Sequence, residues 1–200
     1  MEELLRQAVA PLAEANPRAI AARAGAGYDD SAFRLPFLNR QLAVTFPAGY
    51  VTDDRGRAVP DQLRFIVLHY LLNAKGVAPA DMWVAFRDLP ESNRFGTPFP
   101  DLEILANLFG HDGDGFGRAC LAMGGTPMDR TGDVAFRFAI LPKIIVACIL
   151  YLADEEFPAT LNLVFDARCH LHLTLDDIKA LVDYLLIILK RGAPAPSTTQ

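Results

Sequence analysis

Cysteine is scarce in this sequence. Only three cysteines, Cys120, Cys148 and Cys169, occur among 200 residues, and none of them forms a CxxC pair. An odd and widely spaced set cannot supply the paired framework of a small disulfide-rich secreted domain. The cysteine content therefore argues against a disulfide scaffold and predicts a protein of the reducing cytoplasm.

Long apolar runs and long runs of like charge are also missing. The longest apolar run, residues 144–153, is about half of the roughly 20 residues that a membrane helix needs. The chain begins Met1, Glu2, Glu3, which is the opposite of the basic start of a secretory signal. No run of like charge exceeds three residues, and the formal net charge is -5. Because nucleic acids bind clustered Lys and Arg, we expect no nucleic-acid partner. Because the apolar run is too short to span a bilayer, we expect no membrane partner either.

The composition is that of a folded protein. The chain is 52% hydrophobic and 22% charged, which permits a sizeable core in one domain of this length. We expect an N-terminal helical cap over residues 1–27 and a single domain over residues 28–191. A disordered tail rich in Pro, Ser and Thr is expected over residues 192–200.

Hydrophobic periodicity predicts the elements. Helices are expected over residues 2–24, divided at Pro11 and Pro17, and over 61–75, 101–109, 113–123 and 174–190. Strands are expected over residues 31–35, 41–46, 82–86, 133–140, 143–153 and 161–165. Thr174 and Asp177 resemble a capping box at the start of the last helix. Because the strands follow one another in runs, the pattern predicts an α+β fold. We expect a largely antiparallel sheet flanked by helices, with a C-terminal amphipathic helix.

An acidic corner is the first candidate site. Asp154 and Glu156 follow the most apolar strand, and Asp166 ends the next one. Such carboxylates can act as general acid and base or hold a cation, which would suit a metal-assisted hydrolase or lyase. The alternative is a solvated corner without a function. If the two strands form a hairpin, Asp166 lies at the opposite end from Asp154, and the acids do not converge.

A cysteine and three histidines form the second candidate. Cys169, His170 and His172 lie within four residues, and His69 is predicted on a helix. Thiolate and imidazole groups bind zinc, iron or the iron of a tetrapyrrole. In an extended segment, however, Cys169 and His170 point to opposite faces. The alternative is a turn before a helix with exposed histidines, and His69 as an ordinary boundary residue.

The long loop over residues 87–100 is the third candidate. Arg87 directly follows a short strand, where it can contact the acid groups of a ligand in a bidentate manner. The predicted pocket has aromatic walls, formed by Trp83, Phe86, Phe95 and Phe99. No GxSxG pattern of a serine nucleophile is present.

Several short segments together resemble one known family. They are WVAFRDLP at residues 83–90, FG at 109–110, LAMGG at 121–125, LP at 141–142, DEEFPA at 154–159, LVFD at 163–166 and LTLDDI at 173–178, with YLL at 70–72 and Gly76. Their order resembles that of the DUF3786 family, a bacterial and archaeal domain of unknown function. The resemblance covers roughly residues 28–189, and it rests on the ordered series because no single segment is specific.

The resemblance implies a domain common in anaerobes and methanogens, with some relatives joined to iron–sulfur or corrinoid-associated domains. It implies no catalytic residues, and this chain lacks a cysteine cluster of its own, so an iron–sulfur or corrinoid centre would come from a partner protein. We therefore expect a non-catalytic small-molecule or cofactor-binding accessory domain, for an anionic ligand of the tetrapyrrole type in anaerobic one-carbon metabolism. The alternatives are the metal-assisted enzyme and a protein-interaction domain.

Overall fold

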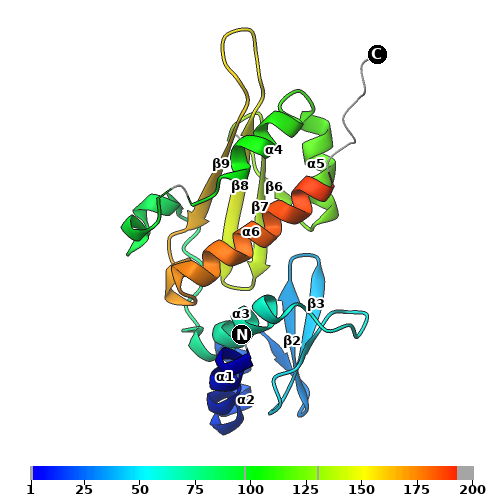
Figure 1. Cartoon of the computed structure of the whole chain (residues 1–200), viewed down its shortest axis with the longest axis vertical. Helices are drawn as coiled ribbons and strands as arrows, with labels where there is room; N and C mark the ends of the chain where they lie inside the picture. Colours follow the sequence, from blue (N-terminus) through cyan, green and yellow to red (C-terminus); the bar gives the residue numbers. More distant parts are fainter. Residues whose placement is uncertain (1, 97, 130, 193–200) are drawn as a thin grey trace.

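The strands form two antiparallel sheets. The structure is a computed structural model that describes residues 2–96, 98–129 and 131–192. The first sheet has the order β1-β2-β3-β4, with strands Gly27–Tyr28, Ala32–Phe37, Arg40–Thr45 and Val51–Thr52. The second has the order β5-β9-β8-β7-β6, with strands Trp83–Ala85, Thr160–Asp166, Ile144–Tyr151, Val134–Leu141 and Thr126–Pro127. The predicted α+β fold is confirmed, and Figure 1 shows the two sheets at opposite ends of the molecule.

Three helices accompany the first sheet: α1 (Glu2–Glu14), α2 (Pro17–Ala24) and α3 (Asp61–Asn73). The predicted break at Pro11 is wrong, because Pro11 lies inside α1. Leu5 and Leu12 are buried on either side of it, and this packing outweighs the hydrogen bond that a proline removes. The break at Pro17 is confirmed. There the Asn16 side chain accepts hydrogen bonds from the first N–H groups of α2.

Three helices pack against one face of the second sheet: α4 (Asp101–Phe109), α5 (Gly113–Ala122) and α6 (Leu175–Arg191). Residues 144–150 of β8 are all buried, as the apolar run predicts. Ile144, Val146, Cys148 and Leu150 join the core beneath the helices, whereas the alternating residues of β8 point to the other face. The predicted amphipathic C-terminal helix is therefore present as α6.

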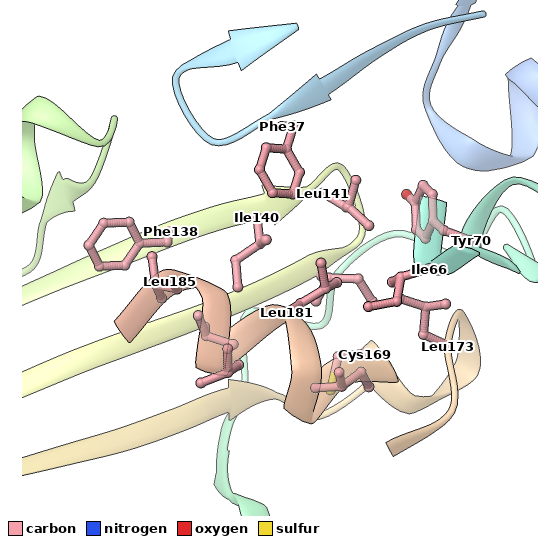
Figure 2. Close-up of a cluster of buried hydrophobic side chains, with 14 of the residues drawn as sticks. Phe37, Ile66, Tyr70, Phe138, Ile140, Leu141, Cys169, Leu173, Leu181 and Leu185 are labelled. Carbon is pink, nitrogen blue, oxygen red and sulfur yellow. The ribbon is translucent and has the colours of Figure 1, made fainter. Parts of the chain in front are cut away.

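A shared core joins the two halves. Figure 2 shows Phe37 of β2 and Tyr70 of α3 beside Leu141 of β7, with Leu181 and Leu185 of α6 beneath them. The Tyr70 hydroxyl donates to the carbonyl of Ala24 (2.8 Å) and accepts from the N–H of Lys143 (3.1 Å). Tyr70 therefore ties α2 to the turn between β7 and β8, across the boundary between the sheets.

All four edge strands are short. β1, β4 and β6 have two residues each, and β5 has three, whereas every interior strand has six or more. β6 also contains Pro127, which has no N–H to donate to a neighbouring strand.

Two predictions concern the ends of the chain and the membrane. Most of the tail expected to be disordered, residues 193–200, lies outside the described residues. Among the helices of the described part, none has both the length and the apolar character that crossing a bilayer requires.

Candidate functional site

Three of the four histidines line one cavity. It has a volume of about 520 Å³ and lies between the end of α3, the loop before α4 and the segment that leads into α6. We call it the histidine cavity. Its lining residues are His69, Asn73, Lys75, Pro90, Glu91, Arg94, His170, Leu171, His172, Leu173, Thr174, Leu175 and Asp176. Long-range folding thus brings together histidines that are a hundred residues apart in the sequence.

His172 is the most buried of these histidines, with 1% of its surface exposed. Its Nδ1 accepts a hydrogen bond from the Lys75 backbone N–H at 3.3 Å, so in the neutral ring the proton lies on Nε2. Within the described chain, that buried Nε2 has no hydrogen-bonding partner, and neither has the buried Nδ1 of His170. Buried polar atoms normally have a partner, so these two nitrogens call for a water molecule or a ligand.

Lowering the pH is expected to destabilise the fold through His172. Burial lowers the pKa of His172, and the Lys143 and His170 charges lower it further, against an opposing effect of Asp166. Above the pKa of the unfolded state, about 6.5, the ring is neutral in both states and the stability is complete. As the pH falls below that value, the unfolded state takes up the proton more readily, and the free energy of unfolding decreases.

The measurement is the free energy of unfolding by urea, determined at several pH values between about 7.5 and 5.5. The His172→Gln variant should lose less stability over this range than the wild type does. An equal slope in both proteins would contradict the assignment of this pH dependence to His172.

His69 is held by a carboxylate. Its Nδ1 lies 3.2 Å from Oδ2 of Asp177, which also accepts a hydrogen bond from the Thr174 hydroxyl at 2.7 Å. Because a carboxylate oxygen accepts, the His69 proton lies on Nδ1 and the lone pair is on Nε2. His69 is 31% exposed at its side chain, so the Nε2 lone pair can bind a donor or a metal ion.

The charges around the cavity are of both signs. Arg94 pairs with Asp176 at 2.6 Å, which occupies both groups. Lys75 is exposed, and no carboxylate of the described residues lies within ion-pair distance of its ammonium group. Glu91 has a positive φ of 63°, an unfavourable conformation for a residue with a side chain. Such backbone strain is concentrated at ligand-binding sites.

The cysteine next to these histidines is not suited to metal binding as it stands. Cys169 is fully buried, and burial raises the pKa of its thiol to about 12. Metal ions bind the thiolate, which this environment disfavours. Over the described ranges, no group of three or more His, Cys, Asp or Glu side chains is arranged to hold a metal ion. The structure brings His69, His170 and His172 to one cavity without the geometry of a metal centre.

The predicted aromatic pocket lies elsewhere. Phe86 and Phe99 are buried, and their rings pack against Phe165 of β9 at 5.4 and 5.9 Å between centroids. The Phe95 ring packs edge-on against Phe86 at 5.3 Å. These rings fill space in the core, and none of them lines the histidine cavity.

Arg87 and Trp83 flank this aromatic cluster. The Arg87 side chain is 88% exposed, and its nearest acidic partner is its neighbour Asp88 at 3.9 Å. Trp83 is half-buried on β5, where it pairs with Asp166 of β9. Neither residue lines the histidine cavity.

Asp166 is separated from the other two candidate acids, Asp154 and Glu156, by the length of a strand. Asp154 follows the end of β8 that pairs with the start of β9, whereas Asp166 is the last residue of β9. Oδ1 of Asp154 accepts from the N–H groups of Glu156 and Phe157, and these bonds lower the pKa of Asp154. Both carboxylate oxygens of Asp166 accept backbone N–H groups of its surroundings. The acids therefore do not converge on one reacting centre.

Sequence reasoning missed Lys75 and the link between His69 and Asp177. A capping box was predicted at Thr174, and the Thr174 side chain does accept from the Asp177 N–H. That pattern contains no information on the partner of the carboxylate, because His69 is 108 residues away along the chain. The sequence likewise does not indicate that Arg94 of the long loop pairs with Asp176 of α6.

The fold and this cavity define the class of the protein: an α+β domain of two antiparallel sheets with a histidine-lined cavity at the end of α3. Residues 16–187 match the family described as domain of unknown function, DUF3786. The match covers more than half of the chain, and the chain belongs to this family. No curated protein and no solved structure matches it.

Proposed function

We propose that this chain is a non-catalytic binding domain, and that its histidine cavity holds a small molecule with acid groups. One observation carries the proposal. The buried His172 Nε2 and His170 Nδ1 have no partner within the described chain, although both side chains line a cavity. A ligand that hydrogen-bonds to them would satisfy both nitrogens at once, and a small shift of the two rings would expose these buried atoms to it.

Three further features support a small-molecule ligand, and the second of them favours an anion. The volume of about 520 Å³ lies within the usual range for small-molecule sites. In the neutral ring, His172 presents Nε2–H as a donor, and Lys75 carries a charge without an acidic partner in the described structure. His69 is preoriented by Asp177, which reduces the entropy lost on binding.

A tetrapyrrole is the specific ligand that the family resemblance suggests, because its propionate or acetate groups suit Lys75 and an imidazole can bind its metal. The Nε2 lone pair of His69 is the accessible nitrogen for that role. The partner would be an iron–sulfur or corrinoid protein, and a corrinoid protein would be the donor or acceptor of such a ligand.

The first test uses nuclear magnetic resonance of the histidine rings during titration with citrate. We expect the ring nitrogens of His170 and His172 to shift, because they would donate to or accept from the bound acid. His111 lies outside the cavity and serves as the internal reference. The Lys75→Met variant should bind citrate about 10- to 150-fold more weakly, since a charge-assisted hydrogen bond contributes about 1.5–3 kcal/mol.

Arg87→Ala is the matched control for Lys75→Met, since it also removes one exposed cation but at the aromatic cluster. Weaker binding by Arg87→Ala with unchanged binding by Lys75→Met would place the ligand at the long loop instead. Equal shifts of all four histidines, or none, would refute the histidine cavity as the site. A haemin titration of wild type and His69→Ala, followed by the Soret band, then tests the tetrapyrrole.

A further inference from the structure

A second cavity of about 380 Å³ lies where the two halves of the molecule meet. It is bordered by the turn between β2 and β3, the loop that leads into α3, the end of α5 and the last turns of α6. The residues that line it are Phe37, Leu38, Asn39, Arg40, Leu42, Asp53, Arg57, Ala58, Val59, Pro60, Leu63, Ala122, Met123, Tyr184 and Ile188. The histidine cavity shares none of them.

A further cavity adjoins this one along α6. A smaller cavity of about 180 Å³ shares Pro60, Leu63 and Tyr184 with it and extends to Ile187, which is 42% exposed. We call the two together the α6 groove. Its base is apolar, because Phe37, Leu42, Leu63 and Met123 are buried beneath it. An elongated apolar chain can therefore lie along α6 and remove this surface from water.

One end of the groove carries an unpaired positive charge. Arg40 is exposed at the start of β3, and no carboxylate of the described residues lies within ion-pair distance of its guanidinium. The other cation, Arg57, donates two bonds to Asp53 at 2.7 and 2.9 Å. Asp183, at the far end, pairs with Lys179 at 2.6 Å. Arg40 is thus the charge that remains for a ligand.

The carboxylate of Asp53 does not compete for Arg40. It accepts from the backbone N–H groups of Arg55 and Arg57 as well as from the Arg57 side chain. The bonds from Arg57 contribute most to holding the pKa of Asp53 at about 2. The Asp53 carboxylate is ionised, and its oxygens already accept these hydrogen bonds. The charges of Asp53 and Arg57 compensate each other, so the pair offers no net charge to a ligand.

The walls of the groove are fixed to each other. The Asn39 side chain donates to the Ala122 carbonyl at 2.6 Å, and the Leu38 N–H donates to the Ile140 carbonyl at 3.2 Å. Gly124 approaches Asn39 so closely that a Cβ would lie 2.9–3.1 Å from three of its atoms. Leu38 takes a positive φ of 53° in this turn. The groove is therefore preformed, and little ordering is needed to fill it.

From this combination we propose that the α6 groove binds a single-chain fatty acid of medium length. The carboxylate pairs with the Arg40 guanidinium in a bidentate manner, and the alkyl chain lies over Leu63 and Tyr184 towards Ile187. The charge at one end and the apolar floor along the rest match the two ends of such a molecule. This site is independent of the histidine cavity.

The test is isothermal titration calorimetry of the full chain with decanoate and with decyltrimethylammonium, which has the same chain and the opposite charge. We expect decanoate to bind at least about tenfold more tightly, because its carboxylate pairs with Arg40, whereas the trimethylammonium group is repelled by Arg40. Arg40→Ala should weaken decanoate binding by about tenfold, and Arg40→Lys should weaken it less. Arg55→Ala is the matched control, since Arg55 is exposed in the neighbouring loop and does not line the groove.

Several results would overturn the proposal. They are no binding of decanoate, equal binding of the two amphiphiles, and equal affinities of wild type and Arg40→Ala. The thermal unfolding midpoint of each variant shows whether it is folded. Arg40→Lys keeps the charge and provides a second measure if Arg40→Ala is unstable. The ring signals of His170 and His172 should not change with decanoate, which separates this site from the histidine cavity.

Discussion

Replacing Phe165 with Ala is expected to lower the free energy of unfolding by about 3–5 kcal/mol. Phe165 is fully buried on β9, between its strand partners Val84 and Val146. Its ring contacts Phe86 and Phe99, so the truncation leaves a cavity that the surrounding strands cannot close. The loss is measured by urea unfolding of the variant and the wild type.

The same experiment decides between two interpretations of the aromatic residues. Phe157→Ala is the control, because Phe157 is 67% exposed and its loss should change stability by less than about 0.5 kcal/mol. If Phe165→Ala were as mild as this control, the aromatic side chains would line an open pocket, as the sequence alone predicted. A large loss identifies them as core.

Replacing Tyr70 with Phe is expected to lower the free energy of unfolding by about 2–4 kcal/mol, although only one oxygen is removed. The change leaves the buried Ala24 carbonyl and the partly buried Lys143 N–H without their hydrogen-bonding partner. An unsatisfied buried group costs about 1–3 kcal/mol. The hydroxyl bridges α2 and the turn between β7 and β8. Its removal therefore weakens the contact between the two halves of the molecule.

Tyr151→Phe provides the matched control. Tyr151 ends β8 and is 42% exposed, so water replaces its hydroxyl contacts and the variant should lie within about 0.5 kcal/mol of the wild type. Both variants are compared by urea unfolding at one pH. A loss of less than about 0.5 kcal/mol in Tyr70→Phe would show that the shared core alone holds the halves together.

The elements could be predicted from the sequence because their signals are local. The apolar stripe of α6 and the Thr174 cap define that helix within one stretch of chain, and the run over residues 144–150 defines β8. The division into two sheets could not be predicted in this way. It depends on which strands pair, and the alternation within β2 or β7 contains no information about the partner.

The candidate site was only partly predictable for the same reason. The residue types were recognised, since His69, His170 and His172 were all candidates for binding. Their common cavity depends on the packing of α3 against the segment before α6, which is a long-range contact. In contrast, Arg87 and the aromatic residues are neighbours in sequence, and they suggested a pocket. In the structure, the rings of the phenylalanines are packed in or against the hydrophobic core instead.

The short edge strands have a consequence for how copies of this chain behave when crowded together. A sheet grows from chain to chain through the unpaired N–H and C=O groups of its outermost strand. In both sheets that strand is only two or three residues long, and at β6 Pro127 removes one of the donors. The long apolar strand β8, which would be the strongest template for fibril growth, has β7 and β9 bonded on its two sides. The native fold thus protects its most aggregation-prone segment, and exposure of β8 requires the loss of a neighbouring strand.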